Sequence, residues 1–371
     1  MLIYKHLLFL FGGVEMIVYF LLTILVFIQM YFAEREKNNN NKIISYILIA
    51  TSIITLALPS ALRKSIGTDY YGYVSIFNIV GTEFNPLERE ITPFFNMLVA
   101  VIKRFTNNPQ WLFVVTSFVF STFSILSITR MSNHWGLSSA LLILGCFYNW
   151  SFSNVRQACA LSLSMYAFSY FYEHKFLRGF VLYLLSFGFH SSAIFIAPIM
   201  ILSCFTGLKK YGLIFVLIVL LMIPFWLNVL IFAKEKLHYK GYFEIIKSPY
   251  IFEFILGFGI ILFVSCFYYN RIYQDDNYTF GLIITFAFAF VFSMLSNHIT
   301  AESTIRTTFW FSWPLIFLIP RMLKINDNKI ISYSITVLLI ITITTLTLNR
   351  AYFAGWYETF PYIDIWGHMI Y

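Results

Sequence analysis

The chain has 371 residues, of which 59% are hydrophobic and 11% are charged, and its formal net charge is +8. A soluble domain usually contains about one quarter charged residues, so this composition excludes an ordinary soluble protein and indicates an integral membrane protein. The basic residues are spread through the links between apolar segments. This favours anionic lipid head groups or phosphates as partners, together with membrane lipids, and predicts no nucleic-acid partner.

Apolar runs of about 20 residues, the length that a helix needs to cross hydrocarbon, recur along almost the whole chain. The clear ones, in chain order, are 16–33, 43–62, 109–129, 211–233, 279–297 and 330–348. Two more, 251–270 and 305–320, carry Glu253 and Arg306, charges that need partners or water inside a membrane. The first run lacks the cleavage pattern of a signal peptide and is expected to remain as a helix.

These runs predict an all-α fold. Residues 1–371 are expected to form a single polytopic transmembrane domain of about 11–13 helices, some of them broken or re-entrant, and GT-C-like in outline. Links rich in Lys and Arg tend to be cytoplasmic, and the natural candidates are 33–42, 172–178, 207–210 and 320–329. This choice places on the outer side a first loop at 63–108, the segment 154–157, His190, a second loop at 234–250, a third loop at 297–306 and the C-terminal tail.

The apolar run 91–102 has to be left out of the crossings for this topology to hold. At about 1.5 Å per residue it covers roughly 18 Å of a hydrocarbon core about 30 Å thick, so it is expected to be re-entrant or interfacial. The alternative is that 135–150 does not cross.

The first outer loop combines basic, acidic and aromatic side chains. Arg63 and Lys64 begin it, and Asp69 follows beside several tyrosines. Tyrosine rings backed by carboxylates suit sugars, since an apolar ring face can stack while the sugar hydroxyls bond to acids. The sugar-binding candidates in this loop are Tyr70, Tyr73 and Glu88, and the alternative is an aromatic belt at the membrane interface.

Arg156 and His190 are isolated polar residues between apolar segments. A guanidinium offers a rigid fork for phosphate oxygens, and the alternative for Arg156 is snorkelling to lipid head groups. His190 interrupts the uncharged run 179–208, where Gly188 and Ser191 favour a break between two half-helices. An imidazole can accept a proton from a hydroxyl at neutral pH, and the alternative is a histidine hydrogen-bonded between helices.

The third outer loop adds Glu302 as an acid/base candidate and Arg306 as a phosphate-binding candidate. The four cysteines lie in apolar runs without metal-ligand spacing, which favours packing. The acidic pair within 274–277 resembles a metal-binding motif but falls in a predicted cytoplasmic turn. The sequence therefore predicts neither a metal nor a cofactor.

Several short motifs in a fixed order carry a family resemblance: RKSIGTDYYGY (63–73), NVRQACALS (154–162), FGFHSSAIFIAP (187–198), the late Arg306 and the tail PYIDIW (361–366). Together they resemble the EpsG family of polytopic exopolysaccharide and O-antigen polymerases, which are related in role to Wzy. The similarity is best over 60–205, whereas the last third matches only in layout.

The resemblance implies transfer of an undecaprenyl-diphosphate-linked chain to the sugar hydroxyl of another lipid-linked repeat unit. It also implies a multi-pass protein of the bacterial cytoplasmic membrane, acting on the periplasmic or extracellular side without a nucleotide-sugar. The positions that match the family's motifs are Asp69, Tyr70, Arg156, Gln157 and His190. Location and chemistry, rather than the resemblance, add Arg63, Glu88, Glu302, Arg306 and Tyr362.

In the predicted mechanism Arg156 and Arg306, helped by Arg63 or Lys64, clamp the diphosphate. Either Asp69 or His190 takes the proton of the acceptor hydroxyl. His190 is preferred because an imidazole ordinarily titrates near neutral pH, although a carboxylate is the commoner base in inverting sugar transfer. A flippase or other transporter of lipid-linked sugars, which would need a basic cavity but no general base, is the alternative. A polysaccharide ligase is a further one, and a chain-length regulator is a candidate partner.

Overall fold

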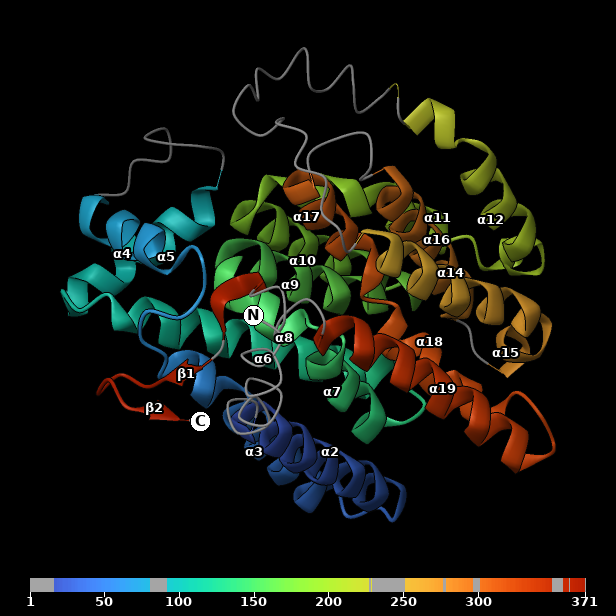
Figure 1. Cartoon of the computed structure of the whole chain (residues 1–371), viewed down its shortest axis with the longest axis horizontal. Helices are drawn as coiled ribbons and strands as arrows, with labels where there is room; N and C mark the ends of the chain where they lie inside the picture. The colour runs from blue at the N-terminus through green and yellow to red at the C-terminus, as the bar shows by residue number, and fades with distance from the viewer. Residues whose placement is uncertain are drawn as a thin grey trace, which may run out of the picture. The chain divides into compact units, whose positions relative to one another are not determined.

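The computed structural model describes residues 17–80, 92–226, 228, 251–275, 278–295, 301–348, 356–359 and 361–370. Over these residues the chain is almost entirely helical, with one short two-stranded sheet, and it is an all-α polytopic membrane protein as predicted (Figure 1). It divides into two compact units. Unit 1 comprises Met1–Ala167, Phe180–Ser191 and Thr347–Tyr371, and unit 2 comprises Phe168–Gly179 and Ser192–Leu346.

Unit 1 contains helices α2 (Ile17–Asn38), α3 (Lys42–Ala61), α4 (Tyr70–Ile79), α5 (Pro93–Phe105), α6 (Gln110–Met131), α7 (Trp135–Leu144) and α8 (Phe147–Ser153). Near its C-terminus it has the 3-10 helix η5 (Trp356–Glu358) and the antiparallel strands β1 (Tyr362–Ile363) and β2 (Met369–Ile370). Helices α9 (Val155–Tyr172) and α10 (Phe176–Phe189) contribute residues to both units.

After the end of α9 and the start of α10, unit 2 resumes in the 3-10 helix η1 (Ser191–Ile196), whose first residue belongs to unit 1. It continues with α11 (Ala197–Ser203), η2 (Thr206–Tyr211), α12 (Gly212–Leu221), α14 (Ile251–Phe267), α15 (Tyr269–Asp275), α16 (Thr279–Leu295), α17 (Ala301–Ser312), α18 (Leu315–Arg321), η3 (Met322–Lys324) and α19 (Lys329–Thr347).

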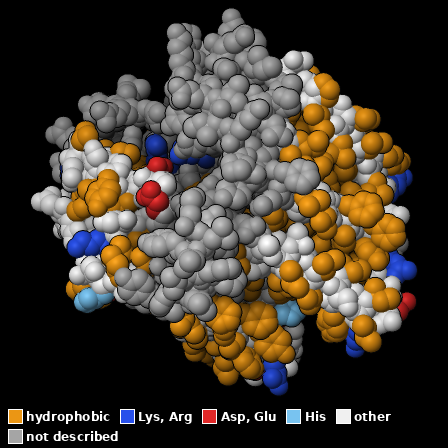
Figure 2. All heavy atoms as spheres, viewed as in Figure 1, with side chains coloured by type: hydrophobic (Ala, Val, Ile, Leu, Met, Phe, Trp, Pro, Cys, Tyr) orange, Lys and Arg blue, Asp and Glu red, His pale blue; other side chains and the backbone are white. Residues whose placement is uncertain are grey.

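Among the described residues, four helices are long and apolar enough to cross a membrane: α2, α3, α6 and α19. A fifth crossing is possible if the pair Ser191–Leu202 and Gly207–Leu221, bent by 97°, forms one broken span. Shorter apolar helices accompany them, and large apolar side chains such as Phe20, Ile43 and Ile47 are exposed. Hydrophobic side chains cover much of the described surface in the view of Figure 2. A surface of this kind suits lipid rather than water. The expected total of 11–13 helices and the GT-C-like outline stay predictions.

The segment 135–153 runs between the two ends of unit 1 as a broken helix. At its start, the backbone N–H of Trp135 donates to Glu34 Oε2 at the end of α2 (2.8 Å). At its other end, the carbonyl of Phe152 accepts from Arg63, which follows α3. Between α7 and α8 the backbone of Cys146 is left-handed (φ 67°), which ends the first helix.

Residues 62–109 leave the end of α3 and return to it. The Gln110 side chain, at the start of α6, donates to the carbonyls of Ala61 (2.6 Å) and Arg63 (3.1 Å). Helices α4 and α5 lie between these points, and Lys103 near the end of α5 donates to the carbonyl of Val80 (2.5 Å). This geometry favours the topology in which 91–102 does not cross, and its place at a membrane interface stays a prediction.

Candidate functional site

The candidate site lies at the end of unit 1 where α3 and α8 finish and α6 and α9 begin, called here the α3 end. Three segments that are distant in sequence meet there: the turn 62–69, the start of α9 and the described C-terminal residues 356–359 and 361–370. Tyr362 Oη donates to the carbonyl of Pro59 (2.8 Å), and the Lys64 N–H donates to the carbonyl of Ile363 (2.9 Å). Tyr19 Oη, on α2, donates to the carbonyl of Thr359 (2.8 Å). The C-terminal segment therefore caps this end of the helices.

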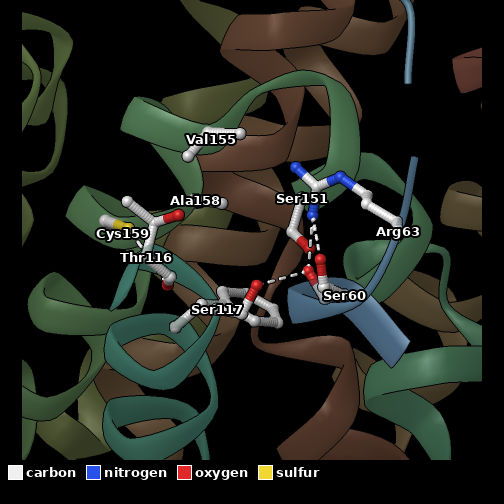
Figure 3. Close-up of a pocket in the computed structure, with 9 residues that line it drawn as sticks. Ser60, Arg63, Thr116, Ser117, Ser151, Val155, Ala158 and Cys159 are labelled. Carbon is white, nitrogen blue, oxygen red and sulfur yellow. Dashed lines mark hydrogen bonds between the residues drawn. The ribbon is translucent and has the colours of Figure 1, made fainter. Parts of the chain in front are cut away.

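Arg63 is buried at the α3 end, with 1% of its surface exposed. Its guanidinium donates to the Ser60 carbonyl (2.9 Å) and to Ser60 Oγ (2.6 Å) (Figure 3). It also donates to the Phe152 carbonyl (3.1 Å) and lies 4.7 Å from the ring centres of both Phe113 and Phe152. Within the described part of the chain no carboxylate pairs with it, and burial lowers the pKa of Arg63 to about 10. It therefore stays charged at neutral pH.

A small polar cavity adjoins this guanidinium, lined by hydroxyls that include Ser60, Ser117 and Ser151 (Figure 3). Its volume of about 10 Å³ is close to what one water molecule needs. Ser117 Oγ donates to Ser60 Oγ (2.7 Å), so α6 is tied to α3 beside the buried charge. Arg63 thus joins α3 to α8. The sequence predicts that Arg63 helps to bind a lipid diphosphate, but its buried position does not favour that contact.

The turn after Arg63 is held against the end of α8. Gly67 has a φ of +98°, and a Cβ there would lie 2.5 Å from the Phe152 carbonyl oxygen, so only glycine fits without strain. The N–H of Thr68 donates to Ser153 Oγ (3.1 Å), which in turn donates to the carbonyl of Tyr357 (3.2 Å). Asp69 directly precedes α4 and is therefore positioned by this turn.

Tyr73 links Asp69 to Arg156. Its ring is 5% exposed, its Oη accepts from the backbone N–H of Arg156 (3.4 Å), and it lies within electrostatic reach of both charged side chains. The Arg156 guanidinium lies 5.7 Å from the ring centre of Phe95. One helix turn from Tyr73, Tyr70 stacks on Phe113 with ring centres 4.6 Å apart. The two tyrosines thus pack as core residues of α4, and their assignment to sugar stays a prediction.

His190 directly follows α10, where the predicted helix break is present. The preceding Phe189 packs against the same hydrophobic cluster that includes Val155 and Phe95, next to Arg156. Gly188 lies directly against the Phe94 ring, which leaves no space for a side chain. The structure therefore brings Arg156, Asp69 and His190 to the same end of unit 1.

Other predicted site residues are placed differently. Gln157 and Tyr362 are each 4% exposed, and Lys64 is exposed. Glu88 lies outside the described residues, and the Glu302 side chain is likewise not described. Arg306 is half-buried on α17 in unit 2, so its convergence with Arg156 stays a prediction.

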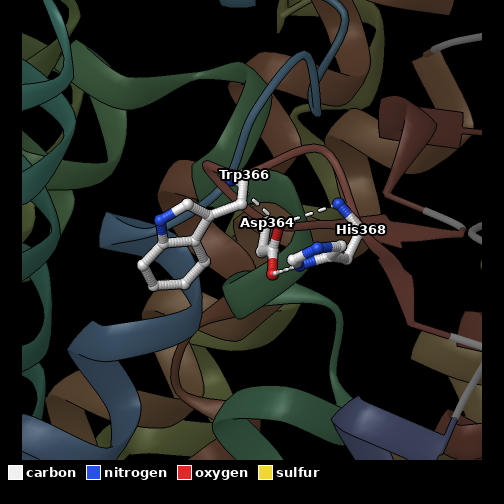
Figure 4. A network of polar contacts seen from close by, with 3 residues as sticks. All are labelled: Asp364, Trp366 and His368. Carbon is white, nitrogen blue, oxygen red and sulfur yellow. Dashed lines mark hydrogen bonds and ion pairs between the residues drawn. The ribbon is translucent and has the colours of Figure 1, made fainter.

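The C-terminal hairpin carries a polar group that the sequence reasoning missed. Asp364 Oδ1 accepts from the N–H groups of Trp366 (3.0 Å) and His368 (2.9 Å), and Oδ2 pairs with His368 Nδ1 (3.0 Å) (Figure 4). Partial burial opposes ionisation of this carboxyl, but the hydrogen bonds from His368 and Trp366 hold the pKa of Asp364 below its ordinary value. The spacing Asp-x-x-Gly-His, with Gly367 at φ +87°, is the signal that could have predicted this turn.

Among the described residues, no three His, Cys, Asp or Glu side chains lie close enough to hold a metal ion. None of the four cysteines forms a disulfide, and Cys146 and Cys159 are buried. The groups available for chemistry at the α3 end are guanidinium groups (Arg63, Arg156), carboxylates (Asp69, Asp364) and imidazoles (His190, His368).

The comparisons with known proteins add one finding. No curated protein and no solved structure matches the chain. The model of the EpsG family matches residues 46–363, a range that includes Asp69, Arg156, His190 and Arg306. At a coarse level this supports a polymerase-type role in polysaccharide synthesis. Because the match covers most of the sequence, the chain belongs to the EpsG family.

Proposed function

We propose that the protein polymerises lipid-linked oligosaccharide repeat units of an O-antigen, capsule or exopolysaccharide. It transfers an undecaprenyl-diphosphate-linked chain to the sugar hydroxyl of another lipid-linked unit, on the outer side of the bacterial cytoplasmic membrane. The observation that carries this proposal is the approach of Arg156 and Asp69 around Tyr73, at the same end of unit 1 as His190. A cation for the diphosphate and two candidate bases for the acceptor thus share one location.

Arg156 binds the diphosphate in this proposal. As the anomeric C–O bond breaks, the electron pair leaves with the diphosphate, and the guanidinium stabilises the negative charge that grows there. The backbone of Arg156 is fixed by Tyr73 Oη and its side chain lies against Phe95, so the charge is held in place before the substrate binds.

Asp69 or His190 accepts the proton of the acceptor hydroxyl while the new bond to the anomeric carbon forms. Each is positioned by backbone structure: Asp69 by the turn held on α8, and His190 by the end of α10. Arg306 is proposed as a second cation for the diphosphate, from unit 2. The apolar faces of the surrounding helices suit the polyprenyl tails.

The test is a chain-elongation assay with the purified protein and lipid-linked repeat units, in which product length is measured. We expect Arg156→Ala to slow elongation by about 100-fold or more, and Arg156→Lys to restore part of the rate. Arg104→Ala is the matched control, because Arg104 is an exposed basic residue at the end of α5 in the same unit.

Normal elongation by both Arg156 variants would overturn the proposed role of Arg156. If the wild-type protein leaves the units unchanged in length but moves them across a vesicle membrane, the chain is a transporter instead. Transfer of finished polymer to a different acceptor lipid would identify a ligase.

A further inference from the structure

Unit 2 contains a cavity of about 660 Å³ that the proposed sugar transfer does not use. It lies where α9 ends and where α10 and α16 begin, beside η2. Its lining includes Tyr172, Glu173, His174, Lys175, Lys209 and Tyr278.

One wall of this cavity is fixed by a hydrogen-bonded acid. Glu173 Oε1 accepts from Tyr278 Oη (3.0 Å), and Glu173 Oε2 pairs with Lys175 Nζ (2.8 Å). The rings of Tyr172 and Tyr278 are 4.9 Å apart, so the two aromatic side chains pack together behind the acid. The carboxylate therefore has an ammonium and a hydroxyl of the protein as partners.

The opposite wall supplies an additional positive charge. Tyr269 Oη donates to the backbone carbonyl of Lys209, which fixes the backbone of η2 at that point. Within the described part of the chain, no hydrogen bond depends on the Lys209 side chain, and Glu173 is the one acid that lines the cavity. Since Lys175 offsets the charge of Glu173, the ammonium of Lys209 gives the lining a net positive charge.

Apolar side chains flank the same links on the protein surface. Phe176 and Leu177, directly after Lys175, are 49% and 77% exposed, and Phe205, before η2, is 58% exposed. A basic recess bordered by exposed apolar groups matches the two parts of an anionic phospholipid, a phosphate head group and acyl chains. The tyrosine hydroxyls can bond to the hydroxyls of a glycerol head group.

We propose that this cavity binds the phosphate of an anionic phospholipid head group, with Lys209 and Lys175 as the phosphate-binding cations. The same chemistry would accept the phosphate of a free glycerol phosphate ester, but the flanking apolar side chains favour the lipid. The site goes beyond the proposed sugar transfer, since it needs neither the acceptor sugar nor the groups of the α3 end.

The experiment uses the full chain purified in detergent and measures binding of short-chain phosphatidylglycerol, with short-chain phosphatidylcholine as the zwitterionic control. We expect the wild-type protein to prefer phosphatidylglycerol, and Lys175→Gln/Lys209→Gln to weaken its binding about 30-fold, since each basic residue contributes roughly a fivefold factor. Lys324→Gln/Lys329→Gln is the matched control, because these two lysines lie in another basic link of unit 2.

If the double variant is not monodisperse, the single variant Lys209→Gln replaces it. We expect this variant to bind phosphatidylglycerol about fivefold more weakly than the wild-type protein. Glycerol 3-phosphate and inorganic phosphate are added as competitors: displacement of the lipid shows that the phosphate alone is recognised, and no displacement shows that the acyl chains are also needed. Either result supports the site when it is lost in the lysine variants. Equal binding of the two lipids by the wild-type protein, or unchanged binding by Lys209→Gln, would overturn the proposal.

Discussion

Arg63 shows how the structure changes the meaning of a single residue. A basic residue at the start of an outer loop favoured a phosphate contact, but the guanidinium points into the protein and donates to Ser60 and Phe152. A buried cation without a carboxylate is costly, and its hydrogen bonds to carbonyls and the adjacent aromatic rings offset part of that cost. Its role at the α3 end is therefore to position other groups.

We predict that Arg63→Ala lowers the free energy of unfolding by about 2–4 kcal/mol, because it leaves buried carbonyls without donors and opens a cavity. Thermal unfolding of the purified protein in detergent measures this. Lys64→Ala is the control, since Lys64 is exposed, and we expect a change within about 0.5 kcal/mol. Equal stability of Arg63→Ala and the wild-type protein would contradict the anchoring role of Arg63.

At the scale of elements, the C-terminal hairpin is held by one carboxylate. Asp364 accepts from two backbone N–H groups and pairs with His368, while Trp366 is 68% exposed at the turn. The pKa of Asp364 is lowered in the folded chain, so its contribution to stability is complete above the ordinary aspartate pKa and is lost as the pH falls through the lowered value.

We predict that Asp364→Asn loosens this hairpin at neutral pH, because an amide cannot accept as strongly from the two N–H groups and loses the pairing with His368. Limited proteolysis should then cleave the C-terminal segment faster than in the wild-type protein, which itself becomes sensitive only at acidic pH. His368→Ala removes the contact between the imidazole and Asp364 but keeps the two backbone N–H donors. We therefore expect it to speed cleavage less than Asp364→Asn does. Identical cleavage rates for Asp364→Asn and the wild-type protein would show that the carboxylate does not hold the turn.

The long helices could be predicted from the sequence because continuous apolar runs determine them. The runs 16–33, 43–62, 109–129 and 330–348 correspond to α2, α3, α6 and α19. The break between α7 and α8 could not be predicted from the sequence. It depends on a left-handed backbone at Cys146, and cysteine has no preference for that conformation.

The site was predictable to a similar degree. Arg156, Asp69 and His190 stand out as isolated polar residues in apolar surroundings, and the structure brings them to one end of unit 1. The inward orientation of Arg63 and the contact of Tyr362 with Pro59 depend on packing between segments distant in sequence, which one sequence without an alignment does not reveal. The sharing of one diphosphate by Arg156 and Arg306 stays a prediction.

At the scale of the whole molecule, α9 connects the two proposed sites. Its first turn carries Arg156 at the α3 end, and its last residue, Tyr172, lines the cavity of unit 2. The topology predicted from the sequence places 154–157 on the outer side and 172–178 on the cytoplasmic side. We therefore expect the α3 end to face outward and the cavity to face the cytoplasm.

Labelling of single cysteines in intact cells tests this expectation. In a variant without the four native cysteines, we expect Lys64→Cys at the α3 end to react with a membrane-impermeant maleimide added outside. Lys175→Cys, whose side chain is 52% exposed beside the cavity, should react only after the membrane is permeabilised. The reverse pattern would place the α3 end in the cytoplasm and would contradict the proposed transfer on the outer side of the membrane. If both cysteines are labelled from outside, the proposed sugar transfer at the α3 end still stands. The cavity would then not face the cytoplasmic leaflet.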